Sequence, residues 1–98
     1  MKCSVIIRPG AEADLQAVKQ WYEERRAGLG LEFVMAVRAA IRGLRENPER
    51  FPVYYRGFRR VLLRRFPYKI FYRIEGDRVI VFRVLRASQD HTRQLGSE

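Results

Sequence analysis

The side chains of this sequence that could take part in chemistry are mostly cations. Guanidinium groups bind phosphates and carboxylates through paired N–H groups. Cations also stabilise the charge that develops when a 2′-hydroxyl attacks a phosphodiester, but that reaction needs a general acid and a general base as well. In the polar C-terminal tail the one titrating candidate is His91. A lone histidine that is exposed on such a tail is usually neutral to function. The candidate cations lie in the second half of the chain: Arg59, Arg60, Arg64, Arg65, Lys69, Arg83 and Arg86.

The positive charge is concentrated in that second half. The chain has 20 Lys and Arg against 11 Asp and Glu, a formal net charge of +9. Residues 1–49 contribute +1 and residues 50–98 contribute +8. Of the 20 basic residues, 17 are Arg, which suits an anionic partner but is also typical of a GC-rich genome. Codon usage does not explain the uneven placement, so we expect a basic surface that faces an anion.

Length and composition exclude several classes of protein. The 98 residues correspond to one domain, residues 1–98, and 47% hydrophobic residues are enough for a core. One cysteine, Cys3, and one histidine provide neither a disulfide framework nor a zinc site, so we expect no metal and no cofactor. No apolar run approaches the ~18 residues of a membrane span, and we see no signal peptide. We therefore expect a cytoplasmic protein without membrane contacts.

The first half of the chain predicts a strand followed by a helical hairpin. Residues 3–8 are rich in β-branched side chains, as in a strand. Helical spacing then appears twice, before and after Gly28-Leu29-Gly30, and Asn47-Pro48 ends the second helix. The short linker predicts two antiparallel helices within residues 11–47. The apolar positions of the first helix are Ala11, Leu15, Val18 and Tyr22, and those of the second are Val34, Val37, Ile41 and Leu44.

The second half predicts three strands. Pro48, Pro52 and Gly57 indicate a loop over residues 48–57. Alternating patterns then predict strands over 58–66, 68–75 and 78–85, and Gly76-Asp77 is typical of a two-residue hairpin turn. In the tail, residues 88–90 are typical of the start of a short helical turn.

The expected fold is α+β, in the order β-α-α-β-β-β. It is a mostly antiparallel twisted sheet with the two-helix hairpin packed on one face. We expect the first strand to lie antiparallel beside the last. The opposite face is expected to carry basic side chains interleaved with aromatics, namely Arg60, Arg64, Lys69, Arg73 and Arg83.

Several short motifs, in this order and spacing over about ninety residues, resemble the RelE/ParE superfamily of toxins from type II toxin–antitoxin pairs. The pattern is most similar to the ParE-like branch, and the family fold agrees with the order of elements predicted above. The motifs are Trp21-Tyr22-Glu23-Glu24-Arg25, Gly28-Leu29-Gly30 with Phe33, Asn47-Pro48-Glu49-Arg50-Phe51-Pro52, Arg59-Arg60, Leu63-Arg64-Arg65-Phe66-Pro67-Tyr68 and Tyr72-Arg73-Ile74-Glu75-Gly76-Asp77.

The resemblance implies one of two activities. RelE-like members cut messenger RNA on the ribosome, whereas ParE-like members are associated with poisoning DNA gyrase and are not themselves catalysts. For RNA cleavage the candidates are Arg60, Arg64, Lys69, Arg83, Arg86 and His91. RelE-like nucleases tend to carry a Tyr or His near the C-terminus, and the tail after Leu85 has no Tyr. ParE-like chains commonly end the last strand with Leu-His-x-x-Arg-Asp-Pro, so Arg86 occupies the usual histidine position and His91 the usual proline position.

The resemblance also implies a partner, a cognate acidic antitoxin similar to ParD. Its tail would neutralise the basic surface and lay an apolar face on the helices. Trp21 and Tyr22 either pack within the helix hairpin, which we favour, or contact the antitoxin. Tyr54 and Tyr55 either pack over the sheet edge or stack on a partner. The basic candidates for contact with antitoxin or target are Arg59, Arg60, Arg64, Arg65, Arg83 and Arg86, some of which could instead be a solvated strand edge.

Three functions follow from these observations. The first is a ParE-like toxin that acts by binding a target such as gyrase, in a module of the kind that stabilises plasmids and also occurs on chromosomes. The second is a ribosome-dependent endoribonuclease that acts on mRNA. The third is a basic nucleic-acid-binding module without toxicity. The absence of an acid–base pair in the tail favours the first.

Overall fold

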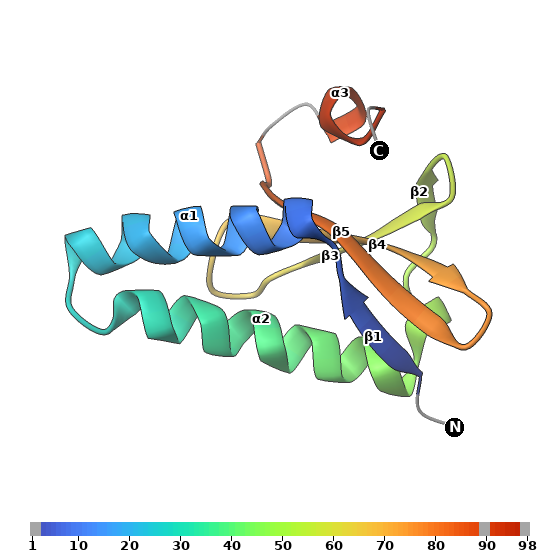
Figure 1. Cartoon of the computed structure of the whole chain (residues 1–98), viewed down its shortest axis with the longest axis horizontal. Helices are drawn as coiled ribbons and strands as arrows, with labels where there is room; N and C mark the ends of the chain where they lie inside the picture. Colours follow the sequence, from blue (N-terminus) through green and yellow to red (C-terminus); the bar gives the residue numbers. More distant parts are fainter. Residues whose placement is uncertain (1–2, 89–90, 97–98) are drawn as a thin grey trace.

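The chain forms a five-stranded sheet, two long helices and a short C-terminal helix (Figure 1). The computed structural model describes residues 3–88 and 91–96. In chain order the elements are β1 (Ser4–Ile7), α1 (Pro9–Arg25), α2 (Leu29–Glu46), a 3₁₀ turn η1 (Pro48–Arg50), β2 (Val53–Tyr55), β3 (Phe58–Leu62), β4 (Tyr68–Glu75), β5 (Arg78–Arg86) and α3 (His91–Leu95). None of the described helices is both long enough and apolar enough to cross a membrane.

The sheet has the strand order β1-β5-β4-β3-β2. Three of its pairings are antiparallel, which confirms the predicted α+β class with a mostly antiparallel sheet. The prediction that the first strand lies antiparallel to the last was wrong, because β1 pairs with β5 in parallel. The helix hairpin returns the chain to the start of β1, where the Cys3 N–H donates to the Arg45 carbonyl at 3.2 Å. β3 and β4 are antiparallel, as are β4 and β5, so β5 runs in the direction of β3. This is also the direction of β1.

One strand was missed within the predicted loop over 48–57. β2 pairs with β3 through a tight turn in which both Arg56 and Gly57 have positive φ, 47° and 80°. Such a turn matches the twist of paired strands, so Gly57 was a hairpin signal rather than a loop signal. β3 ends at Leu62 instead of residue 66. Beyond it the Leu63 N–H donates to the Tyr68 carbonyl at 2.9 Å, which closes a turn that contains Pro67.

The main core lies between the helix hairpin and one face of the sheet. Tyr22 on α1 and Phe33 on α2 contact Phe66 and Tyr68 edge to face, with ring centroids 5.0 to 6.3 Å apart. Edge contacts of this kind add stability beyond the buried area. The remaining buried side chains of this layer are aliphatic apart from Tyr72: Ala11, Val37, Leu44, Leu63, Ile70, Tyr72, Val79, Val81 and Val84.

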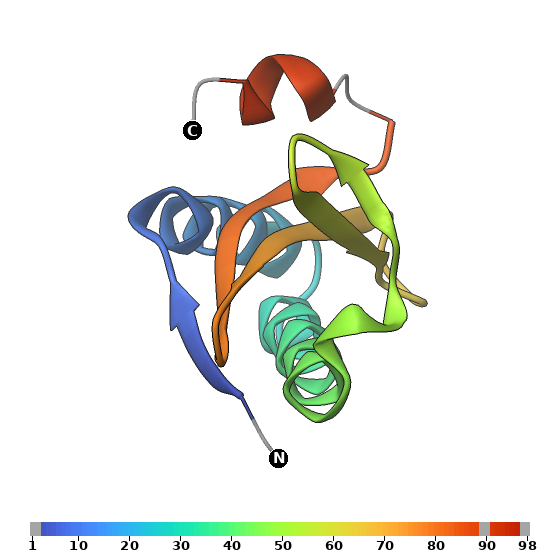
Figure 2. The same ribbon diagram turned by 90° about the vertical axis from the view of Figure 1, so that its right-hand side faces the viewer.

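The other face of the sheet is also covered. A second cluster of buried side chains joins this face to α3 through Leu95, and half-buried Tyr54 and Tyr55 pack against it. Figures 1 and 2 show α3 and α2 on opposite sides of β4 and β5. The predicted basic face is therefore partly a second small core, made of Phe58, Phe71, Ile80, Phe82, Leu85 and Leu95.

A bulge in β5 explains why this strand is apolar at nearly every position. The register with β4 shifts between Phe71 and Tyr72, so that Val81 and Val84 both join the main core although they are three residues apart. An extra residue in one strand has this effect because it resets the alternation of side chains. Phe82 and Leu85 then belong to the second cluster.

We expect the close crossing of the two long helices to make Gly30 indispensable. A Cβ at Gly30 would lie 2.6 Å from the Lys19 carbonyl oxygen of α1, whereas a Cβ at Gly43 of the same helix would meet no atom within 4 Å. Gly30→Ala should lower the free energy of unfolding by about 1–3 kcal/mol. Gly43→Ala, the matched control, should raise it by about 0.5–1 kcal/mol. Urea unfolding measures both changes, and equal effects would contradict the crossing geometry.

Candidate functional site

The structure places the predicted basic residues on both sides of the sheet. Arg64 and Arg65 border a groove beside α2, Arg60 and Lys69 lie on strands of the sheet, and Arg83 and Arg86 border a smaller cavity beside α1. RNA cleavage needs its cations and its acid–base groups within reach of one phosphate. Arg60, Lys69 and Arg83 share the face of Phe71 and Leu85, with which they pair, and the His91 ring lies 4.7 Å from that of Phe71. Two of these groups already have structural partners, because Arg83 is bonded to Asp14 and the buried His91 to the Arg86 carbonyl.

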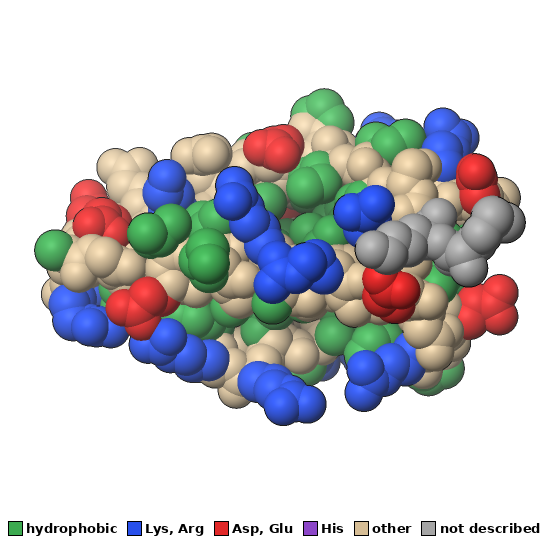
Figure 3. Space-filling view, turned by 90° about the horizontal axis from the view of Figure 1, so that it is seen from below, with side chains coloured by type: hydrophobic (Ala, Val, Ile, Leu, Met, Phe, Trp, Pro, Cys, Tyr) green, Lys and Arg blue, Asp and Glu red, His purple; other side chains and the backbone are tan. Residues whose placement is uncertain are grey.

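A groove lies between α2 and β3, and we call it the α2–β3 groove. Its volume is about 500 Å³. Small residues on one face of α2 leave the space open, because positions three and four apart in a helix lie on the same side. Figure 3, seen from the side on which α2 lies, shows apolar side chains in a hollow with Lys and Arg side chains beside it. The groove is lined by Ala36, Ala39, Ala40, Gly43, Leu44, Phe51, Val61, Leu62 and Leu63, together with Arg50, Arg64 and Arg65.

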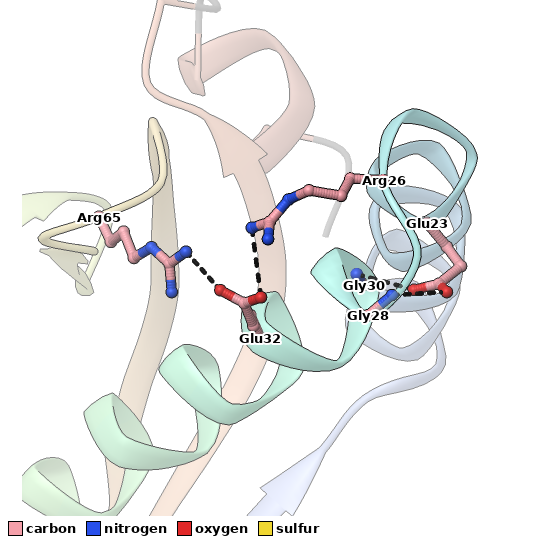
Figure 4. Close-up of polar contacts among 6 residues, drawn as sticks. All are labelled: Glu23, Arg26, Gly28, Gly30, Glu32 and Arg65. Carbon is pink, nitrogen blue, oxygen red and sulfur yellow. Dashed lines mark hydrogen bonds and ion pairs between the residues drawn. The ribbon is translucent and has the colours of Figure 1, made fainter.

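Arg65 is held at this groove by a carboxylate of α2. Glu32 forms ion pairs with Arg65 from the β3–β4 connection and with Arg26 from the turn before α2, the latter at 3.2 Å (Figure 4). Glu32 thus ties three segments together. Arg64 is exposed. The groove therefore combines an apolar floor with cations, which suits a ligand that is apolar on one side and acidic on the other.

A second carboxylate holds the start of α2. Glu23 on α1 accepts hydrogen bonds from the N–H groups of Gly28 at 2.9 Å and Gly30 at 3.0 Å (Figure 4). These N–H groups lie at the N-terminal end of α2, where the helix dipole favours negative charge. The two hydrogen bonds, foremost that of Gly28, lower the pKa of Glu23.

The smaller cavity, about 250 Å³, contains an ion pair that joins α1 to β5. Asp14 accepts from Arg83 Nε at 2.8 Å and Nη2 at 3.0 Å, and also from the Val84 N–H at 2.9 Å. The Arg83 guanidinium is thus engaged in a structural contact. Arg83 was predicted on the opposite face of the sheet, and the register agrees, because Arg83 pairs with Phe71 of the second cluster. Its guanidinium is nevertheless bonded to Asp14 of α1. Arg86 stays exposed beside the same cavity, with Cζ 5.9 Å from the Tyr68 ring centroid.

Sequence reasoning placed His91 on an exposed tail, and this was wrong. His91 is 4% exposed and begins α3. Its Nε2–H donates to the Arg86 carbonyl at 2.8 Å, since a carbonyl can only accept. Its ring lies 4.7 Å from that of Phe71 and 6.4 Å from that of Tyr54. His91 therefore fastens α3 to the sheet. Gln89 and Asp90, two of the three residues expected to start a helical turn, lie outside the described residues.

The predicted aromatic contacts divide into buried and exposed ones. Tyr22 packs in the main core, where burial raises its pKa, while its neighbour Trp21 is 44% exposed and stacks with Arg25 at 3.6 Å. Tyr54 and Tyr55 lie on β2 rather than on a loop and pack against the second cluster. Of the four, Trp21 thus offers the most accessible ring for a partner.

Two further predicted residues lie near β3, and one of them supports local structure. Arg59 donates to the Phe51 carbonyl at 2.6 Å and so holds the segment before β2 against β3. Arg64 was predicted on the opposite face of the sheet, which was wrong, because β3 ends before it and Arg64 faces the α2–β3 groove. Tyr72, whose OH donates to the Pro48 carbonyl at 2.8 Å, has its pKa raised by burial.

Sequence reasoning missed the carboxylates that organise the site. Asp14 was noticed only as an acidic residue near the start of a helix, and Glu32 was not singled out. The sequence places Glu32 between Gly30 and Phe33, two residues that were singled out. Its partner Arg65 is too distant in sequence for a local pattern to pair the two.

Comparison with known proteins identifies the family. The sequence profile described as the ParE toxin of the type II toxin–antitoxin system, parDE, matches residues 5–91. This chain belongs to the ParE toxin family.

Solved structures agree with this assignment at the level of the fold. The chain is similar to a chain of the chromosomal ParDE toxin–antitoxin system from P. aeruginosa, with a TM-score of 0.79 and 22% identity over 89% of this chain and 98% of that one. It is also similar to a chain of the toxin–antitoxin complex RelBE2 from Mycobacterium tuberculosis, with a TM-score of 0.63 and 22% identity over 88% and 99%. No curated protein matches the chain.

The hydrogen bonds of Glu23 predict a pH-dependent contribution to the stability of this ParE-family chain. Because folding lowers the pKa of Glu23, its contribution is present above the ordinary carboxyl pKa and disappears as pH falls through the lowered folded value. Glu23→Gln should therefore lower Tm at pH 7, and the gap should narrow as pH falls below the ordinary carboxyl pKa. Glu24→Gln, an exposed neighbour, is the control and should change Tm little over the same pH range. A gap that is constant with pH would contradict this prediction.

Proposed function

We propose that this chain is a growth-inhibiting toxin of a type II pair that binds DNA gyrase in the cytoplasm and is neutralised by a cognate antitoxin. The observation that carries this proposal is the match of the ParE toxin family over residues 5–91. The resemblance associates this branch with gyrase rather than with RNA cleavage.

The positions of the candidate catalytic residues support binding over catalysis. His91 is buried and bonded to a backbone carbonyl, and Arg83 is bonded to Asp14 on α1. Tyr22 and Tyr72 have raised pKa values because of burial, which makes them poor general bases. A chain that inhibits by binding needs none of these groups in a catalytic constellation.

We propose the α2–β3 groove as the seat of the antitoxin. The expected antitoxin tail is acidic and amphipathic, and the groove offers the complementary surface. Ala39 and Ala40 lie on its apolar side, and Arg50, Arg64 and Arg65 border it. Contacts between the acidic groups of the tail and these arginines would fix the position of the tail along the groove, while the apolar centre would add affinity. The structural matches, which are described as toxin–antitoxin systems, are in keeping with a partner of this kind.

Induced expression of the chain should arrest growth and DNA replication. Purified protein at micromolar concentration should inhibit supercoiling by gyrase, and co-expression of the neighbouring acidic antitoxin should restore growth. Primer extension on translated messages is the parallel measurement. New toxin-dependent cuts with an unaffected gyrase would replace this proposal with the RelE-like ribonuclease, and binding to plain nucleic acid without growth arrest would leave only a non-toxic module.

A charge placed in the groove should separate antitoxin binding from toxicity. Ala39→Glu adds bulk and negative charge at an exposed groove position of α2, so it should weaken antitoxin binding about tenfold or more through like-charge repulsion. Ala13→Glu makes the same substitution at an exposed position of α1 that does not line the groove. Titration calorimetry with the antitoxin measures both. Equal affinities of the two variants for the antitoxin would show that the antitoxin binds outside the groove.

A further inference from the structure

A row of alternating arginine and phenylalanine side chains crosses the second face of the sheet from β1 to β3. Arg8, which follows β1, has Cζ 5.0 Å from the ring centroid of Phe82 on β5. Arg73 on β4 lies 5.3 Å from that same ring and 4.0 Å from the ring of Phe58 on β3. We call Arg8, Phe82, Arg73 and Phe58 the Arg–Phe row.

The rings of this row support the guanidinium groups. Phe58 is 0% exposed and Phe82 is 4% exposed, so neither ring offers surface of its own. A guanidinium that stacks on a ring uses its flat face and keeps the N–H groups on its edge for hydrogen bonds. Arg73 donates one such hydrogen bond, from Nη2 to the Arg56 carbonyl at 2.9 Å. Within residues 3–88 and 91–96, neither Arg8 nor Arg73 contacts a carboxylate.

The spacing of the two cations suits a repeated anion. Because both lie over one ring, their Cζ atoms are no more than about 10 Å apart. Phosphates recur about every 3.4 Å along the axis of one nucleic-acid strand, so two phosphates of the same strand can reach both cations. Arg8 also precedes α1 directly, where the positive end of the helix dipole adds to its charge.

We propose that Arg8 and Arg73 form a binding site for the phosphodiester backbone of a nucleic acid, separate from the α2–β3 groove. Arg60, whose Cζ lies 3.7 Å from the Tyr54 ring centroid, extends this cationic surface toward β2. An acidic protein segment would depend on apolar contacts for much of its affinity, and the rings of the row are already covered. A polyanionic backbone needs no such contacts, because release of its counterions supplies the free energy. The site is independent of the proposed action on gyrase.

The salt dependence of binding tests this site. The full chain is titrated into a labelled single-stranded DNA of about 20 nucleotides at several salt concentrations, and anisotropy gives the affinity. Each lost phosphate contact reduces the magnitude of the negative slope of log K against log salt by about 0.7, so Arg8→Gln/Arg73→Gln should reduce that magnitude by about 1.4. With duplex DNA as the probe, each contact is worth about 0.9. Arg38→Gln/Arg42→Gln removes the same charge from exposed positions of α2 and should leave the slope nearly unchanged.

Three results would overturn the proposal. They are an equal loss of slope in the two double variants, no binding of either DNA by the wild type at about 50 mM salt, and binding of polyglutamate that depends on Arg8 and Arg73 when DNA is not bound. Because Arg73 covers two buried rings, the single variant Arg8→Gln is measured as well. Arg8 is exposed, so this variant should keep the wild-type Tm and still reduce the magnitude of the slope by about 0.7.

Discussion

At the crossing of α1 and α2, Gly30 lies so close to the Lys19 carbonyl that no side chain fits between the two backbones. This contact sets the distance and direction of α2, and the carboxylate of Glu23 fixes its first N–H groups. One turn later, Phe33 reaches Tyr22 and the aromatic side chains of the sheet. The small residues of α2 then face β3 across open space, so the groove that we assign to the antitoxin is a consequence of the helix crossing.

A second constraint acts at the edge of the sheet. β1 pairs with only the first part of β5, from Arg78 to Val81, and the chain then leaves the sheet to begin α1. Beyond Val81, where β1 no longer pairs with β5, the Asp14 carboxylate accepts a hydrogen bond from the backbone N–H of Val84 and another from Arg83. A buried N–H without a partner is costly, so this carboxylate stabilises the junction of helix and sheet. It also converts a cation that the resemblance linked to RNA cleavage into a structural residue.

The excess charge serves two surfaces with different physics. At the α2–β3 groove, cations border an apolar floor, and an amphipathic protein segment can bury apolar area there while its carboxylates meet Arg64 and Arg65. On the sheet face, Arg8 and Arg73 cover the rings beneath them and leave charge without accessible apolar area. The first surface favours a folded or folding protein partner, and the second favours a polyanion. A single net charge of +9 describes both and distinguishes neither.

The sequence by itself determined the helix hairpin, the strands β3 to β5, the α+β class and the superfamily, because side-chain periodicity and the chemistry of Gly, Pro and Asn act over a few residues. β4 has the predicted bounds, and α1 differs at its start by two residues. Only the tertiary structure decided the direction of β1, the pairing of β2, the bulge in β5, the burial of His91 and the partners of the arginines. These features depend on contacts between distant residues, such as Asp14 and Arg83, which are 69 positions apart, and a local pattern contains no information about such contacts.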